Sequence, residues 1–161
     1  MNLEFFAALE ASALARALRN SVWAYPLVNT GHILGAALLV GGIVPLDLRL
    51  LGLWPSVPAR PLLRVLTRTA GAGLMLAVVF GALLFITRAT EYVRSHLFVG
   101  KMAVVGAGVI NLLVFHWIAT RKDRATPPEA RALPSGSRLA GSISLGMWLT
   151  ALALGRLVGY F

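Results

Sequence analysis

The stretch that decides the fold is residues 22–44, which read VWAYPLVNTGHILGAALLVGGIV. It contains no Asp, Glu, Lys or Arg, and its single histidine is His32. A helix needs about 20 apolar residues to cross roughly 30 Å of hydrocarbon. Three further stretches, residues 69–87, 97–119 and 139–160, are long and apolar enough. The sequence therefore predicts four membrane-spanning helices, at about residues 22–51, 66–88, 97–120 and 138–160.

The composition supports a single membrane domain covering residues 1–161. Of the chain, 58% is hydrophobic and the mean hydropathy is +0.78, whereas a soluble domain is about 45–50% apolar. The formal charge of +9 comes from basic residues between the spans, a pattern that membrane topology explains better than nucleic-acid binding. The absence of cysteine excludes disulfides, thiolate metal ligands, iron–sulfur clusters and covalently attached c-type haem.

Small residues recur at four-residue spacing, as in Gly31 and Gly35 or Ala77 and Gly81. Such spacing lets helices approach closely in lipid, so the expected fold is all-α, an integral membrane four-helix bundle. Residues 2–20 place apolar side chains near one helical face, which predicts an amphipathic helix in the membrane interface. A flexible tail is the alternative for this segment.

The loops on the two sides of the membrane differ in basic residues. The loops after the first and third spans hold nine of the 15, namely Arg49, Arg60, Arg64, Arg68, Arg121, Lys122, Arg124, Arg131 and Arg138. Basic loops remain in the cytoplasm, so these two loops, the first of them Pro-rich at residues 54–61, are expected there. Both termini are then expected on the periplasmic side of a bacterial inner membrane.

Ionisable side chains at membrane depth are costly and commonly functional. From the helical rise, His32 lies about 15 Å below the outer boundary and the Lys101 Cα about 6 Å below it. Because the lysine side chain extends inward by a similar distance, we expect the two groups to meet. His116 lies roughly 22 Å further along the third span, near the cytoplasmic surface, and cannot share a metal ion with His32.

A histidine and a lysine at one depth suit haem better than zinc. Zinc prefers four closely set ligands, whereas haem needs one or two axial nitrogens, an apolar slot and cations for its propionates. Several small or basic residues supply the room and charge, namely Gly31, Gly35, Ala36, Gly108, Arg88, Arg94 and Arg156. The sequence therefore predicts a buried haem b, with Lys101 either ligating the iron or pairing a propionate.

Simpler roles remain open for each of these residues. His32 alternatively hydrogen-bonds a neighbouring helix, and Lys101 alternatively extends to the outer interface. His116 is expected near the inner interface with a structural role. Asn111 is expected to bond between helices. Asp47 and Arg49 close the first span, and a local ion pair between their side chains is predicted.

Two runs of residues resemble a known pattern. Residues 31–42, GHILGAALLVGG, followed by residues 45–52, PLDLRLLG, resemble the first span of an uncharacterised family of small bacterial four-span membrane proteins. The third-span signature of that family is matched by Tyr92, Phe98, Lys101, Asn111, Phe115 and His116. The similarity covers most of residues 22–119.

More distantly, the same order of residues is similar to HemJ-type protoporphyrinogen oxidases and CopD-like membrane domains. That resemblance implies His32 and Lys101 as axial ligands of haem b, with Arg49 and His116 as polar residues on the inner side. The chain has Pro45-Leu46-Asp47-Leu48-Arg49 where the HemJ group has an aromatic-Leu-Pro-Arg run, and its interval from lysine to histidine is longer. Haem binding is thus better supported than the oxidase reaction.

The predicted function is electron transfer or oxidation of a small substrate in the inner membrane. A quinone or a redox partner subunit would exchange the electron, and assembly with further copies or into a larger membrane complex is compatible with this function. The alternative is a cofactor-free accessory subunit of such a complex. No nucleic-acid partner is expected.

Overall fold

The structure is a computed structural model that describes residues 3–125 and 136–160. Over these residues the chain forms seven helices, in the order α1 (Leu3–Glu10), α2 (Ala13–Asn20), α3 (Ala24–Leu51), α4 (Ala59–Thr87), α5 (Ala89–Arg94), α6 (His96–Ala125) and α7 (Ser137–Leu157). Within this part of the chain, α3, α4, α6 and α7 are long and apolar enough to cross a membrane. The predicted four-span helical bundle is confirmed, and the protein is an integral membrane protein.

The helices extend further at the loop ends than the sequence pattern indicates. Helix α4 begins at Ala59, well before residue 66, with Pro61 in its first turn. Proline is tolerated there because the first N–H groups of a helix have no partner within it. Helix α6 continues to Ala125, past the predicted loop start at residue 121. The rest of that predicted loop, residues 126–135, lies outside the described residues.

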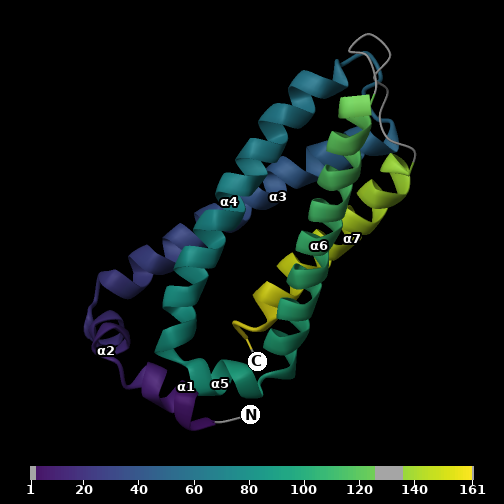
Figure 1. The fold of residues 1–161 in the computed structure, drawn as a ribbon. Coiled ribbons are helices and arrows are strands. Elements are labelled where there is room, and N and C mark those ends of the chain that lie inside the picture. The colour runs from purple at the N-terminus through teal and green to yellow at the C-terminus, as the bar shows by residue number, and fades with distance from the viewer. Residues whose placement is uncertain (1–2, 126–135, 161) are drawn as a thin grey trace.

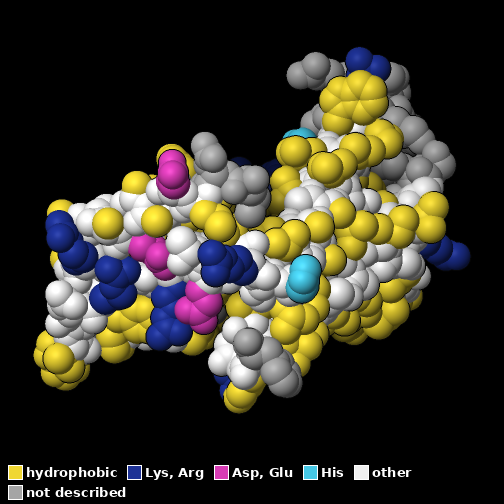
Figure 2. Space-filling model, turned by 90° about the horizontal axis from the view of Figure 1, so that it is seen from below, with side chains coloured by type: hydrophobic (Ala, Val, Ile, Leu, Met, Phe, Trp, Pro, Cys, Tyr) yellow, Lys and Arg dark blue, Asp and Glu magenta, His cyan; other side chains and the backbone are white. Residues whose placement is uncertain are grey.

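The predicted N-terminal helix is instead two short helices. The Ser12 hydroxyl accepts a hydrogen bond of 3.2 Å from the Ala15 N–H, and this N-cap starts α2 as a separate helix. The Arg19 guanidinium then donates to the Thr87 carbonyl at 2.7 Å and so ties α2 to the end of α4. Figure 2 shows the molecule from below relative to Figure 1. In this view, charged side chains gather over the side that carries α1, α2 and α5.

The four spans are arranged as two packed pairs, α3 with α4 and α6 with α7, joined where α3 packs on α7 (Figure 1). Helices α4 and α6 form no comparable packed interface over the described residues. Both chain ends lie at one end of the bundle, here called the terminal end, and the opposite end is called the loop end. The α6 span is also the least buried, at 6% against 17–39% for the other three.

Glycines set the closest helix contact, between α3 and α4. A Cβ atom at Gly73 would lie 2.3 Å from the Leu39 backbone nitrogen, and one at Gly35 would lie 2.4 Å from the Ala77 nitrogen. The buried cluster beside this contact joins Leu39, Ile43, Ala70 and Trp148. The hydrophobic effect contributes little to helix association in lipid. The dispersion contacts between these closely packed backbones therefore stabilise the pairing of α3 with α4.

Candidate functional site

The His32 imidazole lies half-buried between α3 and α4. Its Nδ1 atom is 2.9 Å from the Ala77 carbonyl oxygen. Since a carbonyl oxygen only accepts, Nδ1 carries the hydrogen, and in the neutral ring Nε2 keeps its lone pair. No hydrogen bond to Nε2 forms within the described residues. Gly81 gives the ring its place, since a Cβ atom there would lie 3.0 Å from Cε1.

The Lys101 side chain runs along α7 near the terminal end of α6. A Cβ atom at Gly155 would lie 3.5 Å from Lys101 Cε and 3.7 Å from Nζ, so this glycine makes room for the lysine. Gly81 of α4 lies beside His32, whereas Gly155 of α7 lies beside Lys101, so the expected meeting of the two groups stays a prediction. The basic side chain of Arg156 follows Gly155 directly in α7.

An aromatic cluster of Phe85, Tyr92 and Phe98 lies at the terminal end of the bundle. The Phe85 ring stacks on Tyr92 and Phe98, with centroids 6.2 Å and 5.6 Å apart. Tyr92 and Phe98 themselves lie 5.0 Å apart. Burial raises the pKa of the Tyr92 phenol above its ordinary value. The cluster therefore fixes the start of α6, one turn before Lys101, against α4 and α5.

The sequence predicts space for a haem beside Gly31 and Gly35 of α3, but α4 fills that space. A Cβ atom at Gly31 would lie 2.7 Å from the Phe80 ring, and the space at Gly35 is taken by the Ala77 backbone. On α6, a Cβ atom at Gly108 would lie 3.2 Å from the Trp148 ring. These glycines serve helix packing, and the room they provide is not open to a porphyrin ring.

Arg49 and His116 lie toward the loop end, away from the layer of His32 and Lys101. The Arg49 guanidinium donates from Nε and Nη2 to the Val57 carbonyl, at 3.3 Å and 3.1 Å. The predicted Asp47–Arg49 ion pair is therefore wrong, because residues two apart on a helix do not face each other. His116 is exposed on α6. The cofactor-contacting roles of Arg49 and His116 stay predictions.

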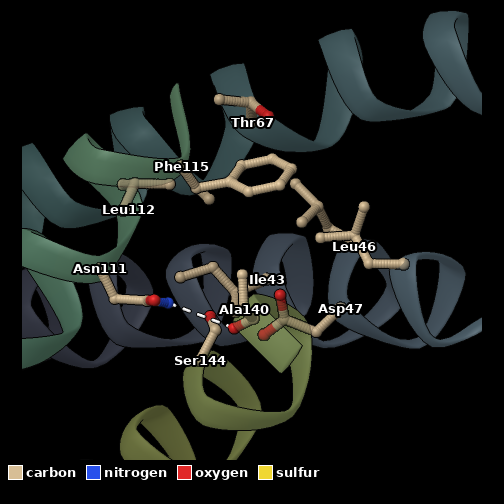
Figure 3. A pocket seen from close by; sticks show the side chains of 11 residues that line it. Ile43, Leu46, Asp47, Thr67, Asn111, Leu112, Phe115, Ala140 and Ser144 are labelled. Carbon is tan, nitrogen blue, oxygen red and sulfur yellow. Dashed lines mark hydrogen bonds between the residues drawn. The ribbon is translucent and has the colours of Figure 1, made fainter. Parts of the chain in front are cut away.

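Asn111 bonds between helices as expected. Its Nδ2 atom donates to the Ala140 carbonyl of α7 at 3.2 Å. This bond crosses a pocket near the loop end, where α3, α4, α6 and α7 all contribute side chains (Figure 3). The pocket is named here the Asp47 pocket, after the acidic residue in its wall.

Sequence reasoning missed the burial of Asp47. Its side chain is 1% exposed, and Gly141 of α7 packs beside its backbone, with a Cβ there 3.2 Å from the Asp47 carbonyl oxygen. The signal was an acidic residue inside the apolar run PLDLRLLG, at residues 45–52. The prediction paired Asp47 with the nearest arginine and did not consider that the Asp47 carboxyl could face the bundle interior.

Within residues 3–125 and 136–160, no three His, Cys, Asp or Glu side chains gather to hold a metal ion. A cofactor with one or two axial ligands places no such demand on the chain. Comparison with protein-family models, curated proteins and solved structures found no match to this chain.

Proposed function

We propose that the protein binds one haem b near the terminal end of the bundle and exchanges electrons in a bacterial inner membrane, with both termini periplasmic. The observation that carries the proposal is the hydrogen bond from His32 Nδ1 to the Ala77 carbonyl oxygen. Iron-ligating histidines characteristically donate their second ring nitrogen to a carbonyl or carboxylate, which orients the ring and raises the basicity of the ligating nitrogen. The His32 ring has this arrangement between α3 and α4.

Lys101 supplies the second nitrogen of the proposed site. Its amine comes from α6, which belongs to the other helix pair from the α3 helix that carries His32. In its neutral form the amine would ligate iron, and as an ammonium it would pair a propionate. The first role is the one we propose, because it takes one nitrogen ligand from each helix pair.

The bound group would supply one-electron chemistry, while the chain would hold and orient it. Helices α4 and α6 meet through the Phe85–Phe98 ring stack but form no extended interface over the described residues, which supports a site reached from the lipid between these helices. A single haem at the terminal end would not bridge the bilayer, so the proposed electron partner is a quinone or a redox partner subunit. Alternatively, the protein would oxidise a small substrate instead of passing electrons between partners.

Titration of the detergent-purified protein with haem tests this proposal. We expect a Soret band that saturates at one equivalent and shifts on reduction with dithionite. A free-haem spectrum that grows without saturation would contradict the proposal, since it would show that the chain has no site for the cofactor.

A second candidate is a cofactor-free accessory subunit of a larger membrane complex. The low burial of α6 favours it, together with the open space at Gly100 and Gly106, where a Cβ atom would meet nothing within 4 Å. A helix of a partner would pack closely on such a face. This candidate predicts co-purifying subunits and no Soret band.

A further inference from the structure

The Asp47 carboxyl group lies inside the bundle with one unpaired oxygen. Its side chain is 1% exposed, and Oδ2 is fully enclosed and has no hydrogen-bond partner among the described residues. Burying an ionised carboxylate in this state costs far more free energy than burying a neutral carboxyl, because the charge loses its hydration and gains nothing in return. The enclosed oxygen therefore indicates that the charge of Asp47 is neutralised.

The described basic side chains do not supply that neutralisation. The residues that line the Asp47 pocket include no Lys, Arg or His. On α3, Arg49 donates to the Val57 carbonyl instead. On α7, the Arg138 guanidinium lies beside Gly52, where a Cβ atom would be 3.8 Å from its Nη2 atom. The basic or titratable residues that α4 and α6 carry near their pocket-lining residues are exposed, namely Arg64, Arg68 and His116.

The space beside Asp47 is too small for an organic molecule. The cavity measures about 30 Å³, which is room for about two water molecules. The other polar side chains in its wall are neutral, namely Thr67, Asn111 and Ser144 (Figure 3). The Asn111 amide already donates to the Ala140 carbonyl.

The enclosure of Asp47 Oδ2 selects the neutralising species. A metal cation takes several oxygen ligands at once, and water or an organic hydroxyl needs an open approach to the oxygen that it contacts. Oδ2 offers no such approach while the helices are packed as they are. A proton bound to the carboxyl needs no space of its own, so it fits this packing.

From these observations we propose that Asp47 is a proton-binding site, which the folded bundle holds as a neutral carboxylic acid at about pH 7, where a solvated aspartate is ionised. Gly141 of α7 packs against the Asp47 backbone, so release of the proton requires α3 and α7 to separate until water reaches the carboxyl. The site lies toward the loop end, away from His32, and its existence does not depend on haem binding.

Carbon-13 NMR of the detergent-purified protein, labelled at the carboxyl carbons of aspartate, tests the proposal. The chain has two aspartates, Asp47 and Asp123, so Asp123→Asn leaves the Asp47 signal alone and Asp47→Asn removes it. In the folded protein at about pH 7, the Asp47 signal has the chemical shift of a protonated carboxyl. Unfolding at the same pH moves it to the position of a carboxylate. A carboxylate signal from Asp47 in the folded protein overturns the proposal.

The pH dependence of stability gives a second, independent measurement. Between about pH 5 and about pH 7 the folded chain keeps the Asp47 proton and the unfolded chain releases it, so this site lowers the folding equilibrium constant about tenfold per pH unit. Asp47→Asn resembles the neutral acid and cannot titrate, so it loses this dependence.

Glu91→Gln is the matched control, because it removes an exposed carboxylate of α5 and keeps the pH dependence of the wild type. Equal pH dependence in the wild type and Asp47→Asn overturns the proposal. So does a shift of the Asp47 NMR signal to the carboxylate position when NaCl replaces choline chloride at one ionic strength, since it would show a Na⁺ site.

Discussion

His32→Ala is expected to abolish saturable haem binding, lowering affinity by at least about 100-fold. The substitution removes the proposed iron ligand, and loss of an orienting partner alone costs about 10- to 100-fold in metal sites. The Ala77 carbonyl would also lose the hydrogen bond that His32 Nδ1 donates at 2.9 Å. Titration at the Soret band, with the wild type measured beside the variant, gives both affinities.

His96→Ala is the matched control for this experiment. His96 begins α6 and is exposed at the terminal end, so its removal should leave haem affinity unchanged. Equal binding by the wild type and His32→Ala would show that His32 is not the ligand. If neither protein binds haem and His32→Ala fails to assemble with co-purifying subunits, the accessory-subunit function is favoured instead.

Gly73→Ala is expected to destabilise the bundle by about 3 kcal/mol, the upper part of the usual range for overpacking. The new Cβ atom would lie 2.3 Å from the Leu39 nitrogen and 2.8 Å from the Gly35 carbonyl oxygen. Both are backbone atoms, so no side-chain rotation relieves the clash and α3 must move away from α4. The unfolding free energy in mixed detergent micelles, followed by circular dichroism, measures the loss.

Gly71→Ala offers a control two residues away on the same helix. A Cβ atom at Gly71 would meet nothing within 4 Å, and alanine has a helix propensity about 1 kcal/mol better than that of glycine. This variant should be as stable as the wild type or slightly more so. Equal destabilisation by the two substitutions would mean that the α3–α4 contact at Gly73 does not stabilise the bundle.

Membrane-spanning segments were the most predictable part of the fold. An uninterrupted apolar run such as residues 22–44 has few alternatives to a helix in lipid, where every backbone group must be bonded internally. The helix ends were less predictable, because they depend on local caps. Ser12 divides the N-terminal segment, and Pro61 sits within a first turn instead of ending a loop.

The site was predictable only in outline. Depth alone predicted that His32 and Lys101 share a layer, and this stays a prediction. Periodicity did not reveal which glycines face a neighbouring helix, so Gly35 was assigned to a cofactor although α4 fills the space beside it. Asp47 was paired with Arg49 by proximity in sequence, whereas the rotation of α3 turns its carboxyl toward Ser144.

Electron paramagnetic resonance of the ferric, haem-loaded protein tests most directly whether His32 and Lys101 ligate one iron. The wild type should give a low-spin signal, since two nitrogen ligands make the iron six-coordinate. Lys101→Ala should retain haem through His32 and give a high-spin signal. A low-spin signal of unchanged shape in Lys101→Ala would contradict ligation by Lys101.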